Sequence, residues 1–183
     1  NVAASLAALA ASPAELEAVY LNLGGRSGMF SYDATISAGI IASDPKQGLY
    51  VASVFGGAWE RRYDGDVSLL WFGLVYGDST LNAGIIEAAY AMSSNYKGMK
   101  LITPEGGYGI HREVNLPSAY ARSEWIGYWY AMDGFSGDYM VFLDSGGQSE
   151  AYTPQFYYPA FIDNMWLKCR FLTRGFRTYN VDH

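Results

Sequence analysis

The sequence predicts a mainly β protein with short helices near its N-terminus. Of its 183 residues, 50% are apolar and 16% are charged, a balance that supports a large core and argues against disorder. Aromatic residues make up 16% and are accompanied by 21 glycines, which favours strands joined by tight turns. Beyond about residue 108, strand-like segments recur roughly every 10 to 25 residues, a spacing typical of a sandwich or a solenoid.

Residues 1–23 are expected to form a helical stalk or connector. Apolar side chains recur at alternating intervals of three and four residues, the a/d pattern of a coiled coil, at Leu6, Leu9, Leu16, Tyr20 and Leu23, with Pro13 in the same register. Ser12-Pro13-Ala14-Glu15 has the form of a capping box, so a second helix is expected to begin there. The segment is either a short oligomeric stalk or a pair of amphipathic helices packed on its own domain, and the sequence leaves both open.

A small β module is expected over residues 24–75. Its strand candidates are residues 29–32, 48–54, 59–63 and 67–72, separated by turn signals rich in glycine and aspartate. A helix is then expected over residues 80–94. Asp78-Ser79-Thr80 can cap its start, and one face carries the apolar residues Ile85, Ile86, Ala89 and Met92.

The remainder of residues 76–183 is expected to form short strands. The candidates are residues 99–103, 108–110, 113–116, 124–130, 138–144, 160–169 and 176–181. The segment 160–169 becomes almost wholly apolar in its second half, as a strand buried on both faces does.

The composition excludes several classes of function. A net charge of −6 argues against a nucleic-acid or anionic membrane partner, because both need clustered Lys and Arg. No apolar stretch is long enough for membrane insertion. Cys169 is the only cysteine, which rules out an intrachain disulfide, and with only His111 and His183 beside it a zinc site is not expected. We therefore predict no metal and no cofactor.

No catalytic arrangement is recognisable in the sequence. Glycoside hydrolysis uses two carboxylates roughly 5 to 10 Å apart. The carboxylates of the C-terminal part each lie near a predicted turn and form no evident pair: Asp138, Asp144, Glu150, Asp163 and Asp182. Trp125 and Trp129 would share one face of a strand, where they either stack on a sugar or pack against the helix or a neighbouring subunit.

Four motifs follow one another in a telling order. Trp71-Phe72-Gly73 is followed by Gly77-Asp78-Ser79-Thr80, then by the helix with Ile85-Ile86-Glu87-Ala88-Ala89, and then by Pro104-Glu105-Gly106-Gly107-Tyr108. Together they resemble the entry to pectate-lyase-like right-handed β-helices, especially those of bacteriophage tailspikes and tail fibres. The resemblance covers roughly residues 24–118, including a small β module of the kind that often precedes such an entry. The Asp-Asp-Thr segment of the family is replaced here by Thr80-Leu81-Asn82-Ala83, which affects the start of the helix and not an activity.

The resemblance implies the start of a right-handed parallel β-helix that is capped by an amphipathic helix. The open first coil of such a solenoid exposes apolar side chains and unpaired backbone groups, and a helix laid across it covers both. Ile85, Ile86 and Ala89 would form the covering face of the 80–94 helix. Trp71 and Phe72 would lie at the junction between the β module and the solenoid.

The protein so implied is a homotrimeric tailspike or tail fibre of the phage virion. It would contact other tail proteins, and it would bind and degrade a bacterial surface polysaccharide. The present chain would be its non-catalytic N-terminal attachment part and a fragment of the whole. Two alternatives stay open: a secreted bacterial polysaccharide lyase or hydrolase of the same fold, and a non-catalytic adaptor or lectin.

Overall fold

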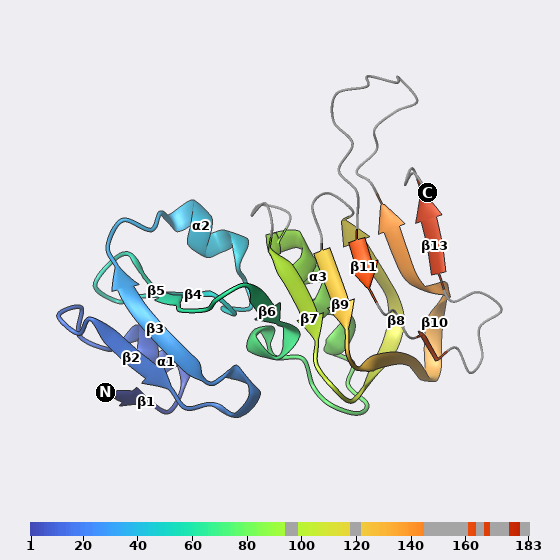
Figure 1. The fold of residues 1–183 in the computed structure, drawn as a ribbon, viewed down its shortest axis with the longest axis horizontal. Coiled ribbons are helices and arrows are strands. Elements are labelled where there is room, and N and C mark those ends of the chain that lie inside the picture. The colour runs from blue at the N-terminus through green and yellow to red at the C-terminus, as the bar shows by residue number, and fades with distance from the viewer. Residues whose placement is uncertain (94–98, 118–121, 145–160, 164–166, 169–175, 180–183) are drawn as a thin grey trace, which may run out of the picture. The chain divides into compact units, whose positions relative to one another are not determined.

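The computed structural model describes residues 1–93, 99–117, 122–144, 161–163, 167–168 and 176–179 (Figure 1). The chain divides into two compact units. Unit 1 comprises residues 1–65 and 70–73, and unit 2 comprises residues 66–69 and 74–183. The described residues form a mixed arrangement of small sheets and short helices in which strands predominate, in agreement with the predicted mainly β composition.

Unit 1 is built on a five-stranded sheet with the order β1-β2-β3-β5-β4. The strands are β1 (Val2–Ala3), β2 (Ala18–Leu21), β3 (Gly28–Asp33), β4 (Tyr50–Ala52) and β5 (Ala58–Arg61). β1 and β2 pair in parallel, and the other pairs are antiparallel. The helices are α1 (Leu6–Ala10) and α2 (Ala38–Ser43), with a single turn, η1 (Gly24–Arg26), between β2 and β3. One face of the sheet and α1 enclose a core of Ala3, Leu9, Val19, Leu21, Phe30, Val51 and Trp59.

The prediction that residues 1–23 are helical is wrong except at α1. Only α1 is helical, and its cap is Ser5, whose Oγ accepts a hydrogen bond from the Ala8 amide at 3.0 Å. Pro13 does not begin a second helix. Instead β2 follows, with Val19 and Leu21 buried and Tyr20 exposed between them. The alternation of a strand places two large side chains in the core of unit 1, and this burial outweighs the local helical pattern.

Unit 2 consists of parallel strands and one long helix. Its elements are β6 (Asp66–Ser68), α3 (Asn82–Ser93), β7 (Lys100–Thr103), β8 (Gly107–Pro117), β9 (Arg122–Trp125), β10 (Tyr128–Asp144), β11 (Phe161–Asp163), β12 (Leu167–Lys168) and β13 (Phe176–Tyr179). The short 3-10 helix η2 (Leu69–Phe72) is divided between the two units. The helix expected over residues 80–94 is confirmed as α3, which begins two residues later than expected, while residue 94 lies outside the described part of the chain.

Two sheets alternate along the chain of unit 2. One has the order β11-β9-β7-β6, and the other contains β8, β10, β12 and β13, and the described strands of both sheets pair in parallel. The chain therefore passes from β7 in the first sheet to β8 in the second, returns to β9, and crosses again to β10 (Figure 1). The described residues form these small sheets and not a closed or complete β-helix.

Candidate functional site

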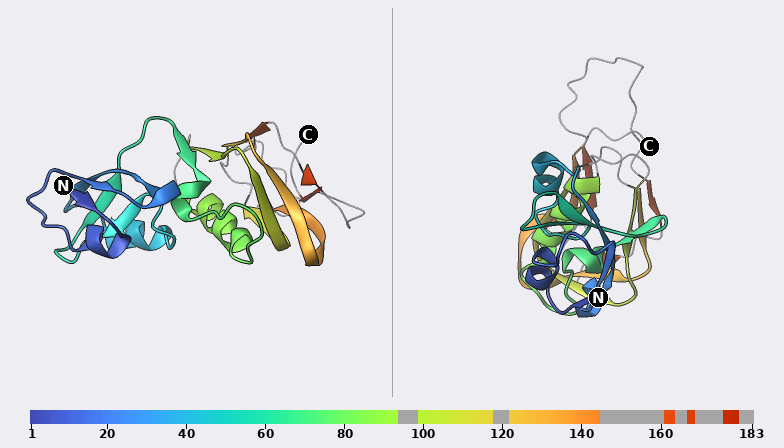
Figure 2. Two further views of the ribbon diagram at one scale, coloured as in Figure 1. Left: turned by 90° about the horizontal axis from the view of Figure 1, so that it is seen from below. Right: turned by 90° about the vertical axis from the view of Figure 1, so that its left-hand side faces the viewer.

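The helix α3 buries one face against β8 and β7, and Figures 1 and 2 show it beside these strands. Ile85 is 4% exposed, while Ile86 and Ala89 are completely buried. The three residues proposed from the sequence as a covering face are thus all in the core of unit 2. Asn82, Ala83, Tyr90, Met92 and Ser93 are buried with them, so the helix is covered over more of its circumference than the predicted stripe.

Asn82 connects the start of α3 to two other segments. Its Oδ1 accepts a hydrogen bond from the Val75 amide at 2.9 Å, and its Nδ2 donates to the Val75 carbonyl at 2.8 Å and to the Gly109 carbonyl at 3.1 Å. The carboxamide is completely buried, and these three bonds use both its donor hydrogens and its acceptor. This residue lies in the segment that departs from the family pattern, and its role was not predicted from the sequence.

Glu87 lies on another face of α3 and forms an ion pair with Arg112 of β8. The Arg112 nitrogens Nη1 and Nη2 each lie 2.6 Å from a different Glu87 carboxylate oxygen, and the Asn115 amide donates to the same carboxylate at 2.9 Å. Partial burial by itself would raise the pKa of Glu87, but these hydrogen bonds and the positive charge of Arg112 bring it below its usual value. The pair therefore holds the helix in a fixed position along β8.

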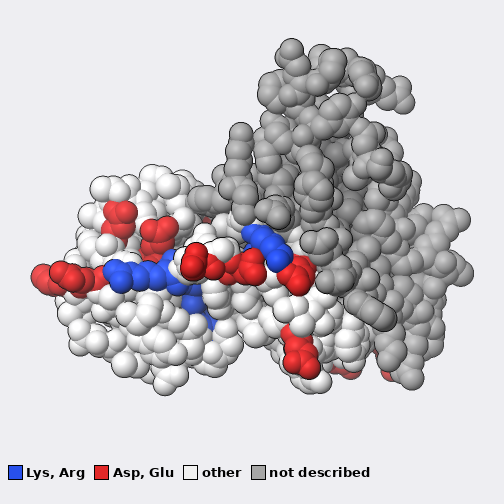
Figure 3. All heavy atoms as spheres, in the orientation of Figure 1, with Lys and Arg blue, Asp and Glu red and all other residues white. Residues whose placement is uncertain are grey.

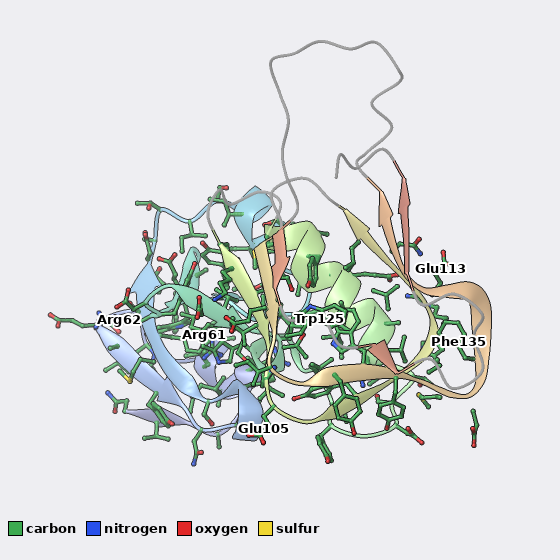
Figure 4. All side chains as sticks on the ribbon, turned by 45° about the vertical axis from the view of Figure 1, so that its right-hand side comes forward. Arg61, Arg62, Glu105, Glu113, Trp125 and Phe135 are labelled. Atoms are coloured by element: carbon green, nitrogen blue, oxygen red, sulfur yellow. The ribbon has the colours of Figure 1, made fainter. Side chains whose placement is uncertain are left out.

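A buried polar group links α3 to β9. The Tyr90 hydroxyl is hydrogen-bonded to Ser123 Oγ, and Trp125 Nε1 donates to that same Oγ at 2.8 Å. Figure 4 shows Trp125 beside the helix. Burial raises the pKa of Tyr90, so its hydroxyl stays protonated over the whole neutral range.

Trp125 and Trp129 do not form a surface for sugar stacking. Their ring centroids are 3.8 Å apart with the planes inclined by 30°, and the two side chains are 1% and 0% exposed. Neither ring face is therefore accessible to a glycan. The other interpretation, packing against the helix, agrees with the hydrogen bonds of Trp125. The two residues also belong to different strands, because Ile126 and Gly127 form a turn between β9 and β10.

Trp71 and Phe72 both belong to unit 1. Phe72 is 1% exposed and lies so close to Gly48 that a Cβ there would be 2.5 Å from the ring. The Trp71 ring packs against the guanidinium of Arg61, with 4.6 Å between the Arg61 Cζ and the ring centroid. The two predicted junction residues thus complete the packing of unit 1.

Arg61 is a buried cation that the sequence analysis missed. It is 2% exposed, and its guanidinium donates to the carbonyl oxygens of Gly48, Ser27 and Arg26 at 2.7, 3.0 and 2.7 Å. Burial and, after it, the charge of Arg26 lower the pKa of Arg61, the charge of Asp44 partly offsets them, and the resulting pKa is about 10. The sequence signal that could have revealed this burial is the position of Arg61 in β5, where Trp59 and Arg61 are buried on either side of the less buried Glu60.

Gly77 and Asp78 attach the segment before α3 to β8. The Gly77 amide donates to the Gly107 carbonyl, and the Gly109 amide donates to the Gly77 carbonyl, both at 2.9 Å. Asp78 Oδ1 accepts a hydrogen bond of 2.6 Å from the Tyr130 hydroxyl of β10. Burial, this hydrogen bond and the Asp78 charge raise the pKa of Tyr130 to about 12. The motif Gly77-Asp78 therefore adds a parallel bridge to the second sheet.

Neither a metal site nor a membrane-spanning helix is found among the described residues. Among them no group of His, Cys, Asp and Glu is placed to hold a metal ion, and no described helix is long and apolar enough to span a membrane. Figure 3 shows acidic and basic side chains interspersed on a mostly uncharged described surface. The side chains of Asp138, Asp144 and Asp163, and the whole of Glu150, Cys169, Asp182 and His183, lie outside the described part of the chain.

Comparison with known proteins gives a result at the level of structure only. No family model and no curated protein sequence matches the chain. Over 97% of its length it superposes, with a TM-score of 0.71 and 14% identity, on 24% of the enzymatically active domain of tailspike protein 4 from bacteriophage CBA120. The chain shares its fold with phage tailspike domains. The tailspike protein of Acinetobacter baumannii phage AM24 gives a TM-score of 0.53 at 13% identity, again over 97% of this chain and over 33% of that one. The chain thus spans about a quarter to a third of these tailspike structures.

Proposed function

We propose that this chain is an N-terminal structural and attachment segment of a homotrimeric phage tailspike or tail fibre. Unit 1 would be the connecting module toward other tail proteins. Unit 2 would be the first part of a right-handed parallel β-helix that continues beyond residue 183. The whole spike would bind and degrade a bacterial surface polysaccharide, with the catalytic residues located outside the segment described here.

The alternation of two parallel sheets is the observation that carries the proposal. β7, β8, β9 and β10 follow each other in the chain and belong alternately to the first and the second sheet. Lys100 pairs with Arg122, and Gly107 pairs with Tyr128, so each sheet gains a parallel neighbour as the chain returns to it, and a longer stretch of chain separates Arg122 from its next partner, Phe161. A chain that returns repeatedly to the next parallel position of the same sheet generates a solenoid.

The position of α3 supports the role of the helix as a lid. Its apolar face lies on β8 and β7, the first strands of the two sheets after the helix. The start of a solenoid otherwise exposes core side chains and unpaired strand edges to water. The apolar face of α3, with Ile85, Ile86 and Ala89 buried, covers these strands and would remove that exposure.

The test uses the full-length protein and the particles that contain it. Light scattering is expected to give the mass of three chains, and antibodies raised against residues 1–65 are expected to label the phage tail in electron micrographs. A full-length monomer found free in bacterial culture medium would contradict the proposal and favour a secreted lyase or hydrolase. Loss of viscosity of a host capsular polysaccharide then tests degradation separately from attachment.

A further inference from the structure

Three tyrosines and one carboxylate share the outer face of the second sheet of unit 2 and form what we call the tyrosine–aspartate face: Tyr76, Tyr128, Tyr130 and Asp78. Successive side chains of a strand point to opposite faces of the sheet. Tyr108 of β8 and Trp129 of β10 are 1% and 0% exposed, so the residues that flank them face outward. Gly77 bridges to Tyr108 in parallel, and the residues on either side of Gly77 face outward in the same way. Accordingly, Tyr76 is 72% exposed and Tyr128 is 40% exposed.

Two glycines of β8 let these side chains lie close to the sheet. Gly107 is opposite Tyr128, and Gly109 is opposite Tyr130. A Cβ on Gly107 would lie 2.8 Å from the Tyr128 Cζ, and a Cβ on Gly109 would lie 2.8 Å from Asp78 Oδ1. The hydroxyl end of the Tyr128 ring and the Asp78 carboxylate therefore lie directly over the backbone of β8.

Contacts within the tyrosine–aspartate face hold its side chains in place. The Tyr130 hydroxyl donates to Asp78 Oδ1 at 2.6 Å, and the Tyr130 ring centroid lies 6.1 Å from that of Tyr128. The Tyr76 and Tyr108 rings are 6.1 Å apart and inclined by 80°. A partner thus meets a preformed surface and loses little affinity to the ordering of side chains.

The negative charge of Asp78 is not balanced by a base among the described residues. The ion pairs of the described Lys and Arg side chains are made with Asp66, Glu87 and Glu124. Residues 74–84, 101–111 and 125–132 carry the tyrosine–aspartate face and contain no Lys or Arg. They include a second exposed acid, Glu105. Aromatic ring faces beside an unbalanced carboxylate attract a cation.

The open shape of the face selects an arginine carried by a larger partner. Small ligands bind in concave sites that bury most of their surface, whereas Tyr76 projects into solvent. A guanidinium is planar, so it stacks on an aromatic ring and also pairs with a carboxylate through two parallel hydrogen bonds. A carboxylate accepts about four hydrogen bonds, so the bond from Tyr130 leaves Asp78 free to accept such a pair.

The arginine side chains that the structure describes are already engaged within their own chain. Arg26 and Arg61 donate to backbone carbonyl oxygens, Arg62 donates to a serine hydroxyl, and Arg112 pairs with Glu87. This assigns the incoming arginine to a different protein, and a second copy of the chain becomes an outcome of the test.

We propose that the tyrosine–aspartate face is a docking site for an arginine side chain of a different protein. The guanidinium stacks on an exposed tyrosine ring and pairs with Asp78. The inference concerns unit 2 alone and holds whether or not the parent protein is a tailspike.

Photocrosslinking of the full-length protein in its native assembly tests the docking site. A benzophenone amino acid replaces Tyr76, and the control carries it at Tyr20, which is 39% exposed and lies on β2 of unit 1. The expected result is a crosslink from position 76 to an arginine-containing peptide of a different protein. No crosslink above that of position 20, or one to a second copy of the chain or to a glycan, would overturn the proposal. A partner outside the virion would contradict the tailspike function and leave the docking site supported.

Binding measurements with the crosslinked partner test the role of the charge. Asp78→Asn keeps an acceptor for the Tyr130 hydroxyl but removes the negative charge, and we expect it to weaken binding by about tenfold at low salt and by less at high salt. Asp133→Asn, which alters an exposed carboxylate of the same strand as Tyr130, should leave the affinity unchanged. An equal loss in the two variants, or a loss that does not depend on salt, would refute the pairing.

A double-mutant cycle connects Asp78 to the arginine itself. Asp78→Asn is combined with the replacement of the crosslinked arginine of the partner by glutamine. The combined loss of affinity should be smaller than the sum of the two single losses, because both substitutions remove the same interaction. Additive losses would show that the arginine binds elsewhere.

Discussion

Glu87 and Arg112 join α3 to β8 through two parallel hydrogen bonds, each 2.6 Å long, between different pairs of atoms. This bidentate geometry is the strongest form of a carboxylate–guanidinium pair. Ile86, the residue before Glu87, is completely buried. The ion pair and this burial together fix α3 on β8.

Removing the charge of Glu87 should weaken the attachment of α3. We expect Glu87→Gln to lower the free energy of unfolding of unit 2 by on the order of 1 kcal/mol, a value already reduced for solvent screening of a partly exposed pair. Since the folded-state pKa of Glu87 lies below its usual value of 4.5, the contribution is present above that pH and is lost as pH falls through the folded-state pKa. Urea titrations of both proteins at neutral and acidic pH measure the difference. The exposed Glu105→Gln is the control, and an equal loss in that variant would contradict the pairing.

The hydroxyl of Ser123 should be essential to the interior of unit 2. Ser123→Ala leaves the buried Trp125 Nε1 without its 2.8 Å acceptor, and we expect a loss of about 1–3 kcal/mol in stability. Tryptophan fluorescence during urea unfolding reports this site directly. A double-mutant cycle that combines Ser123→Ala with Tyr90→Phe should show coupling, because the Tyr90 hydroxyl is hydrogen-bonded to the Ser123 oxygen that also accepts from Trp125. The exposed Ser136→Ala should change little, and additivity in the cycle would argue against a shared network.

The close approach of Gly48 and Phe72 should tolerate no side chain. In Gly48→Ala the new Cβ would lie 2.5 Å from the Phe72 ring, so the ring has to move within a packed region. We expect a destabilisation of about 1–3 kcal/mol. Gly39→Ala is the matched control, since its Cβ would meet only Ser37 Oγ at 3.8 Å in α2. That variant is expected to be neutral or up to about 1 kcal/mol more stable, because alanine favours helix. Thermal unfolding that ranks the two variants the other way would refute this packing.

The acidity of Tyr130 should depend on Asp78. Its pKa of about 12 results from burial first and from the hydrogen bond and charge of Asp78 next. Asp78→Asn should therefore lower the pKa of Tyr130 toward, though not to, its ordinary value of 10.0, while Asp133→Asn leaves it unchanged. Since the folded-state pKa is raised, this interaction stabilises the fold below pH 10 and is lost as pH rises toward 12. A titration followed by NMR of labelled tyrosine measures the shift, and an unaltered pKa in Asp78→Asn would disprove the coupling.

The sequence predicted unit 2 better than unit 1 for a physical reason. The helix α3 has enough length and enough apolar residues at helical spacing to be recognised locally. Ile85, Ile86 and Ala89 were therefore assigned to the buried face correctly. The N-terminal segment carries a similar spacing, yet β2 forms there, because the alternation of a strand buries Val19 and Leu21 in the core of unit 1.

The candidate site was predicted in its apolar part and missed in its polar part. Trp125 and Trp129 were expected on one face of a single strand, but the tight turn at Gly127, against the Pro104 carbonyl, divides that strand in two, and the two rings stack in the interior. The hydrogen bonds of Asn82, Arg61 and Asp78 were missed because the partners of these residues lie on distant segments of the chain. Hydrogen bonds of this kind depend on strand register, which the order of residues does not specify by itself.

The strand β10 advances by five residues against two of β8 in each of two intervals, from Ala131 to Ser136 and from Ser136 to Val141. The paired positions on either side of these bulges remain in parallel register, with Ala131 opposite Ile110 and Val141 opposite Val114. The additional residues of β10 are thus accommodated in these two bulges, and the paired residues of β8 and β10 on either side keep their hydrogen-bonded pairing. Insertions or deletions at residues 132–135 should therefore alter only the outer contour of unit 2, and a variable, outward-facing loop could evolve there while the stacked strands stay as they are.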